Sequence, residues 1–129
     1  MKNTIIILTI LICTVSFGQN KTKRALFLGN SYTGVNNLPQ IIADIATSMN
    51  DVLIFDSNTP GGYTLQGHST NTTSISKINM GNWDYVILQE QSVIPSSKHS
   101  VVDQQFFPFA RILDSMNHAS NFVVKPYSI

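Results

Sequence analysis

The sequence predicts an α/β domain with a mostly parallel sheet, because short apolar runs alternate with segments of helical periodicity along the chain. The apolar runs are short and continuous, which is typical of strands that are buried on both faces. Polar turns carrying glycine, hydroxyl or amide groups follow these runs. Ligands bind beyond the carboxyl ends of the strands in such sheets, so we expect these turns to lie together at one site.

The first half of the chain predicts strand, helix and strand. Residues 25–28 form a continuous apolar run that suits a buried strand. Apolar residues then recur at helical spacing over residues 38–49, with Pro39 in the first turn, where its missing N–H costs nothing. Residues 52–55 predict the second strand. Residues 59–62, Thr-Pro-Gly-Gly, predict a turn that uses the backbone freedom of glycine.

The second half continues the alternation. A weak helical pattern covers residues 68–78, and residues 85–88 form a third apolar run. Apolar residues at three- and four-residue steps predict a helix over residues 102–116, which Pro108 should kink or end. A fourth strand is expected to begin at residues 122–124.

The first 18 residues have the pattern of a secretory signal peptide. Lys2 precedes an apolar run over residues 4–15, and small residues follow at the usual cleavage positions. An uncleaved anchor is the alternative, but a membrane-spanning helix needs about 20 apolar residues. Cys13, the only cysteine, lies in this run, so the exported chain would contain no disulfide. Residues 19–129 are then long enough for one domain, located in the periplasm or outside the cell.

Charge and composition limit the ligands that the domain is expected to bind. Eight Lys and Arg residues against seven Asp and Glu residues give no excess that would favour nucleic acid or a membrane surface. The three histidines are scattered and no cysteine cluster exists, so we expect no metal. Gly61 and Gly62 lack the Lys and Ser/Thr of a phosphate-binding loop, so we expect no cofactor. A small neutral or modestly polar substrate is the remaining expectation.

Three ordered blocks resemble the SGNH/GDSL hydrolase superfamily. They are Gly29-Asn30-Ser31-Tyr32 after the first strand, Gly61-Gly62-Tyr63-Thr64-Leu65 with His68, and Trp83-Asp84-Tyr85-Val86-Ile87-Leu88-Gln89-Glu90-Gln91-Ser92. The combination is similar to a bacterial envelope branch of that superfamily, and the resemblance covers residues 24–124. It implies a flavodoxin-like three-layer fold. Because such a sheet usually has five strands, we expect the fold to be incomplete at the C-terminus of this sequence.

The chemistry that the resemblance implies is acyl transfer from an ester, in which a serine attacks the carbonyl and N–H groups hold the oxyanion. Ser31 would be the nucleophile, and its own N–H would be one oxyanion donor. The N–H of Gly61 or Gly62 would be the second. The superfamily takes its third donor from an asparagine side chain after the third strand. Gln91 occupies that place in this sequence, with Gln89 as the rival.

Four neighbouring residues are candidates for contacts with the substrate. Tyr32 is expected to be an aromatic residue at the rim or a packing residue, and Asn30 either meets the substrate or hydrogen-bonds the turn. His68 could line the cleft, where it would bind substrate, cap the next helix or act as a substitute base. Glu90 either orients another group or meets solvent. For Ser31 itself, the alternative to a nucleophile is a helix cap or turn residue.

The superfamily's general base is a histidine three residues after an aspartate, and this pair is absent from the sequence. The residues three positions before the histidines are Leu65, Ser96 and Ser115. We therefore expect the 129 residues to be an N-terminal part of an esterase, with little activity alone on small-molecule or carbohydrate esters. Two alternatives remain, namely a noncatalytic module that binds carbohydrate or acyl groups, and the product of a nonfunctional gene fragment.

Overall fold

The core of the fold is a sheet of three parallel strands in the order β2-β1-β3. The computed structural model describes residues 20–118, in which the strands are β1 (Thr22–Leu28), β2 (Val52–Asn58) and β3 (Tyr85–Leu88). The mixture of helices with an all-parallel sheet confirms the predicted α/β class, and the strand order is consistent with a flavodoxin-like arrangement. The predicted signal peptide and the fourth strand expected at residues 122–124 lie outside the described residues.

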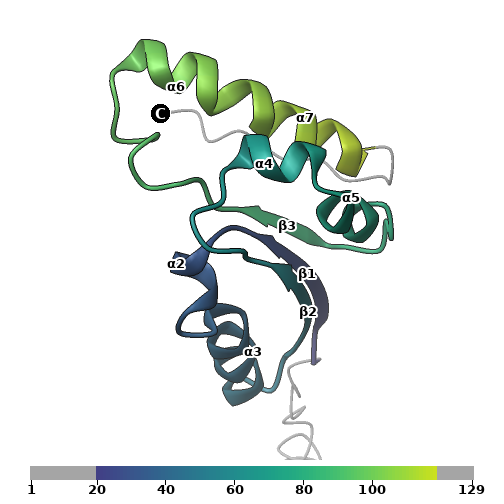
Figure 1. Ribbon diagram of the computed structural model, residues 1–129. Coiled ribbons are helices and arrows are strands. Elements are labelled where there is room, and N and C mark those ends of the chain that lie inside the picture. Colours follow the sequence, from purple (N-terminus) through teal and green to yellow (C-terminus); the bar gives the residue numbers. More distant parts are fainter. Residues whose placement is uncertain (1–19, 119–129) are drawn as a thin grey trace, which may run out of the picture.

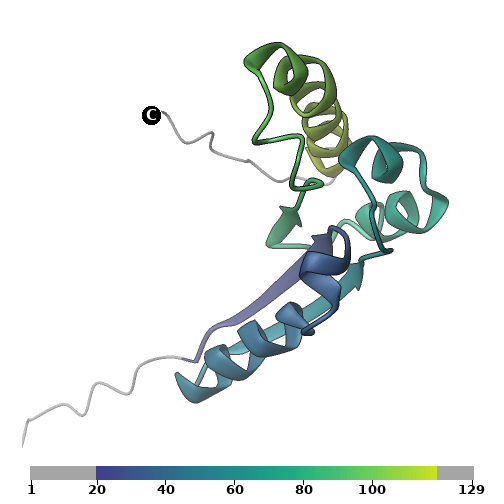
Figure 2. The same cartoon turned by 60° about the vertical axis from the view of Figure 1, so that its left-hand side comes forward.

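Helices cover both faces of this sheet and make three layers (Figures 1 and 2). On one side, α3 lies along the sheet, and the short α2 leads into it from the end of β1. On the other side lie α4, α5 and α7, with α6 continuing into α7. No helix in residues 20–118 has the length and apolar character that crossing a bilayer requires. The helices are α2 (Ser31–Gly34), α3 (Leu38–Ser48), α4 (Leu65–Thr70), α5 (Thr72–Ile78), α6 (His99–Gln105) and α7 (Phe107–His118).

The central strand is buried on both faces, as its apolar run predicts. Residues 25–28 of β1 are all inaccessible to solvent or nearly so. Leu26 and Leu28 point into the core on the side of α4, α5 and α7, where they pack with Leu65, Ile78, Trp83 and Leu113. This core lies directly beneath the carboxyl end of β1. The turn that follows β1 therefore starts from a rigid support.

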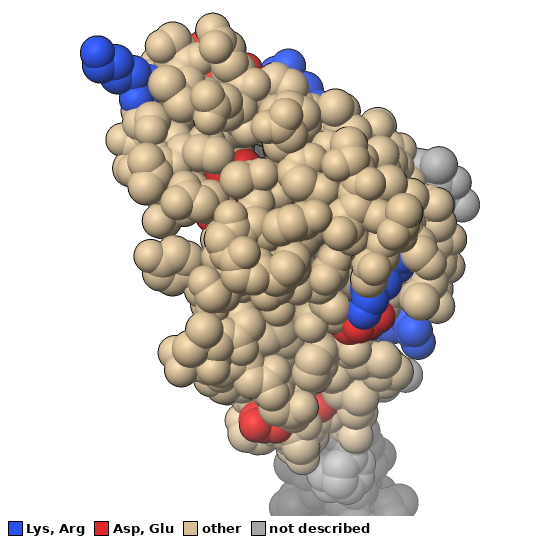
Figure 3. All heavy atoms as spheres, in the orientation of Figure 1, with Lys and Arg blue, Asp and Glu red and all other residues tan. Residues whose placement is uncertain are grey.

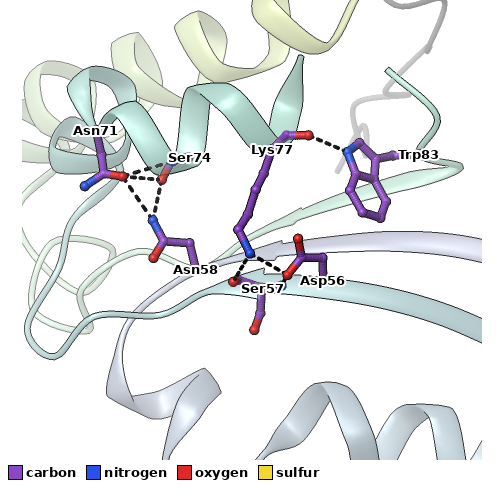
Figure 4. A network of polar contacts seen from close by, with 7 residues as sticks. All are labelled: Asp56, Ser57, Asn58, Asn71, Ser74, Lys77 and Trp83. Atoms are coloured by element: carbon purple, nitrogen blue, oxygen red, sulfur yellow. Dashed lines mark hydrogen bonds and ion pairs between the residues drawn. The ribbon is translucent and has the colours of Figure 1, made fainter. Parts of the chain in front are cut away.

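Strand β2 continues beyond the predicted residues 52–55. Asp56, Ser57 and Asn58 stay in register with β1 although they are polar. Figure 4 shows why these groups can lie under α5: Lys77 pairs with Asp56 and donates to the Ser57 carbonyl, while Asn58 reaches the Asn71 and Ser74 side chains. A polar group that is buried with its hydrogen-bond partners costs little.

Proline and asparagine divide the two predicted helical stretches. The helix expected over residues 102–116 is split at Phe106 into α6 and α7, and Pro108 occupies the first turn of α7, where no N–H is needed. The stretch of residues 68–78 is two helices, α4 and α5. Asn71 separates them, and its side chain accepts a hydrogen bond from Ser74 N to cap α5.

Helix α3 confirms the predicted helix but packs through smaller residues than its apolar pattern suggests. Pro39 and Ala43 are buried against the sheet, which lets the helix backbone come close. Most of the larger apolar residues face outward, namely Leu38, Ile41, Ile45 and Met49.

Candidate functional site

The turns after the three strands meet at the carboxyl edge of the sheet. Gly29 N donates to Asn58 O at the end of β2 (3.2 Å), and Asn30 N donates to the Gln89 side-chain oxygen just after β3 (2.9 Å). The Asn30 amide also donates to Tyr63 O in the glycine-turn segment (2.9 Å). These bonds confirm the expectation that the three turns are neighbours. The segment before Ser31 is thereby held from both flanking strands.

Gly29 fits this position because a side chain has no room. A β-carbon at residue 29 would lie 2.7 Å from both the Gln89 side-chain oxygen and the Thr33 hydroxyl. These two groups also hydrogen-bond each other at 3.0 Å, so neither is free to move aside without breaking a contact. The close approach of Gln89 and Thr33 is therefore possible only over a glycine.

Asn30 holds the turn and caps α2. Its side chain is buried, with the amide nitrogen bound to Tyr63 O and Oδ1 accepting from Tyr32 N (3.1 Å). Its carbonyl accepts from Thr33 N and Gly34 N, both at 3.0 Å. Of the two roles expected for Asn30, the structure places it in the turn-binding one. A buried side chain with both ends bonded is not placed to touch a substrate.

Ser31 is the first residue of α2 and is partly exposed. Within residues 20–118, no hydrogen bond reaches its hydroxyl or its backbone N–H. The first N–H groups of a helix have no intrahelical partner, so this N–H and the hydroxyl next to it can both meet a ligand. Tyr32 beside it is 71% exposed, so it is not a packing residue of the core.

The glycine turn lies beside α2. Its two ends contact the Ser31 segment, since Tyr63 O binds the Asn30 amide and the Thr59 hydroxyl would lie 2.7 Å from a β-carbon on Gly34. Gly61 and Gly62 are exposed between these ends. Gly62 has φ +69°, a left-handed conformation that favours glycine, whereas a β-carbon on Gly61 would meet nothing within 4 Å.

The two glutamines after β3 have different surroundings. The Gln89 side-chain oxygen accepts hydrogen bonds from Asn30 N and from the Thr33 hydroxyl. Its NH2 group donates to Glu90 O. The Gln91 side-chain oxygen accepts from Val93 N (2.9 Å), while no bond within the described residues uses its NH2 group. Gln91 thus keeps an amide donor for a ligand, and Gln89 acts as a tie between β3 and the Ser31 turn.

Glu90 was expected either to orient another group or to meet solvent. It is only 6% exposed, so it does not meet solvent. Its carboxylate accepts from Leu65 N, with both oxygens at 3.2 Å, and from Gln91 N at 2.7 Å. It therefore orients the start of α4 relative to the loop after β3. Because these contacts occupy the carboxylate oxygens, Glu90 is not placed to bind substrate.

His68 is fully buried, so the predicted contact with substrate does not fit its position. Its Nε2 lies 2.8 Å from Gly29 O and its Nδ1 lies 2.7 Å from the Ser74 hydroxyl, with the Tyr63 ring packed edge-on against the imidazole. Neither ring nitrogen remains for a proton transfer at Ser31. Asn71 caps α5 in place of His68. Burial lowers the pKa of His68 below its usual 6.5, and the Gly29 hydrogen bond opposes this only in part.

The lowered pKa of His68 predicts how stability depends on pH. Below pH 6.5 the unfolded chain binds a proton at His68 more readily than the folded chain, so the free energy of unfolding should fall as the pH decreases. Above pH 6.5 His68 should contribute no slope. Urea denaturation between pH 7.5 and 5 measures the effect, and His68→Gln should flatten the curve in that window. An equal slope in the variant would show that other groups cause the pH dependence. Asp84 does not interfere, because the Lys23 hydrogen bond lowers its pKa and it changes stability only below its usual pKa of 3.8.

Three residues that hold the turn are not distinguished by the sequence. Thr33, Asn58 and Ser74 are ordinary polar residues in the chain, and only the fold brings them to Gln89, Gly29 and His68. The one signal in the sequence for these contacts is the polar end of β2, which directly follows the apolar run of that strand. Among residues 20–118, no group of three or more His, Cys, Asp or Glu side chains is arranged to hold a metal ion.

Comparison of the chain with protein-family models, with curated proteins and with solved structures finds no match.

Proposed function

We propose that this chain carries the nucleophile-bearing part of an exported SGNH-like serine esterase that acts on ester bonds such as the O-acyl groups of carbohydrates. Ser31 is the nucleophile. The oxyanion donors are the N–H of Ser31, the N–H of Gly61 or Gly62, and the side-chain amide of Gln91. Gln89 is not among them in this proposal, because both ends of its amide are bound.

The observation that carries the proposal is the contrast between Ser31 and the residues before it. Gly29 and Asn30 are bound from both neighbouring strands, whereas the Ser31 hydroxyl and N–H form no bond with any residue in 20–118. A hydroxyl presented at a helix start from a fixed turn can attack a carbonyl while the adjacent N–H stabilises the oxyanion.

A second candidate function, a noncatalytic module that binds an acyl group or a carbohydrate, is favoured by one observation. No histidine or carboxylate within the described residues hydrogen-bonds Ser31, and His68 is committed elsewhere. Without a base the serine is a weak nucleophile. For either function we predict that the 129 residues alone have little esterase activity.

The test is the reaction of the chain with a short-chain nitrophenyl ester and with a fluorophosphonate, an electrophile that labels nucleophilic serines. We expect ester turnover close to the uncatalysed rate and slow covalent labelling, which peptide mass spectrometry should locate at Ser31. Ser31→Ala should remove the label, because the attacking oxygen is gone. Ser76→Ala, a change at an exposed serine on α5, should leave it in place.

The outcomes separate the alternatives. Ester turnover that Ser31→Ala abolishes would refute the low-activity prediction and support the nucleophile. Absence of the label at Ser31, together with saturable binding of an acetylated sugar that Ser31→Ala leaves unchanged, would favour the binding module. Absence of both would reject both functions.

A further inference from the structure

We propose that His68 is a positioning residue for Ser31, which acts through the peptide unit that joins Gly29 to Asn30. The proposal rests on the proposed function for its chemical meaning. Its geometric part stands on the hydrogen bonds around that peptide unit.

The direction of each hydrogen bond around His68 follows from the Gly29 carbonyl, which can only accept. His68 Nε2 therefore donates to it, and in a neutral imidazole Nδ1 must then accept, from the Ser74 hydroxyl. The Ser74 oxygen in turn accepts from the Asn58 amide at 2.8 Å. A single directed chain of donors thus runs from Asn58 through Ser74 and His68 to the Gly29 carbonyl.

This chain is anchored by the contacts between α5 and β2 (Figure 4). Lys77 reaches across from α5 to Asp56 and to Ser57 O, and the Trp83 indole donates to Lys77 O at 2.8 Å. Asn71 Oδ1 accepts from Ser74 N (3.0 Å). Ser74, which is buried, is consequently held at a fixed distance from β2.

The Gly29 carbonyl and the Asn30 N–H belong to one planar peptide unit. His68 holds the carbonyl end at 2.8 Å, and the Gln89 side-chain oxygen holds the N–H end at 2.9 Å. Glycine gives the chain unusual rotational freedom at this position, so the two contacts remove a freedom that the sequence otherwise supplies. The next peptide unit carries the Ser31 N–H at its nitrogen end, and its Asn30 carbonyl accepts from Thr33 N and Gly34 N. Asn30 therefore joins the peptide unit that His68 and Gln89 hold to the one that presents Ser31.

The groups in contact with the imidazole are uncharged, so His68 acts as a neutral donor. They are the Gly29 carbonyl, the Ser74 hydroxyl and the edge of the Tyr63 ring. The charged side chains on neighbouring segments are bound elsewhere: Lys77 pairs with Asp56, and Glu90 accepts from Leu65 N and Gln91 N. The role of His68 in this arrangement is therefore to orient the peptide unit between Gly29 and Asn30.

The test compares His68→Leu with His68→Gln and with Ile78→Ala. Leucine removes the donor, glutamine keeps an N–H that can reach the Gly29 carbonyl, and Ile78→Ala weakens the same core without touching the turn. We expect His68→Leu to slow fluorophosphonate labelling of Ser31 by about 10- to 100-fold. His68→Gln should recover most of this loss, and Ile78→Ala should label at the wild-type rate under conditions where every variant is folded.

Backbone amide signals of Asn30 and Ser31 in NMR spectra provide a readout that does not depend on reactivity. They should shift, and the Asn30 N–H should exchange faster, in His68→Leu but not in Ile78→Ala. Unchanged amide signals in His68→Leu, or equal changes in Ile78→Ala, would overturn the positioning role. If wild-type Ser31 takes up no label while the amide signals behave as expected, the proposed esterase function fails and the positioning role stands.

Discussion

Replacing Leu113 with alanine should lower the free energy of unfolding by about 2–5 kcal/mol. Leu113 lies on α7 and is fully buried in the core cluster that also contains Leu26 and Leu28 of the central strand. The substitution removes buried methyl groups and leaves a cavity that a packed sheet cannot close. Alanine is a good helix former, so the loss of helix propensity adds almost nothing.

The preceding residue on the same helix provides a matched control. Ile112 is 40% exposed, and Ile112→Ala should change the free energy of unfolding by much less than Leu113→Ala. Urea denaturation of both variants measures the difference. Equal losses would mean that α7 does not hold the core through Leu113 and that the layer over β1 is packed differently.

The element types followed from the sequence because local patterns determine them. The apolar run of residues 25–28 predicts a doubly buried strand, and β1 is buried over those residues. Pro108 predicts a break, and the chain changes from α6 to α7 just before it. The meeting of three polar turns followed from parallel strands alone, since their carboxyl ends share an edge.

The roles of individual site residues did not follow, because partners far along the chain decide them. His68 and Gly29 are 39 residues apart, and Glu90 and Leu65 are 25 residues apart. A histidine after the glycine turn and a glutamate at a strand end suggest contacts with a ligand, yet both side chains are buried and hydrogen-bonded within the fold. The extension of β2 through Asp56 has the same origin, because its partner Lys77 lies on another element.

The buried carboxylate of Glu90 should be the most sensitive polar group near the site. Glu90→Leu would leave the buried N–H of Leu65 and the partly buried N–H of Gln91 without their acceptor. Hydrogen bonds to a charged group contribute about 1.5–3 kcal/mol each, and an unsatisfied buried donor costs about 1–3 kcal/mol. Because the two bonds share one carboxylate, we expect a total loss of about 2–4 kcal/mol in the free energy of unfolding.

Two further variants separate the lost acceptor from the lost charge. Glu90→Gln keeps one oxygen that can accept from the backbone, so its loss should be clearly smaller than that of Glu90→Leu. Asp44→Leu, a change at an exposed carboxylate on α3, should alter the free energy of unfolding by less than about 0.5 kcal/mol. Equal effects of Glu90→Leu and Asp44→Leu would show that the carboxylate does not support α4.

The position of Glu90 also links stability to the proposed chemistry. Leu65 begins α4, and His68 lies one turn further along the same helix, where it holds the Gly29 carbonyl. When the start of α4 loses its acceptor, His68 should lose its fixed distance to the turn. We therefore expect Glu90→Leu to slow fluorophosphonate labelling of Ser31 under conditions where the protein remains folded. Labelling at the wild-type rate would show that the start of α4 moves independently of the Ser31 turn.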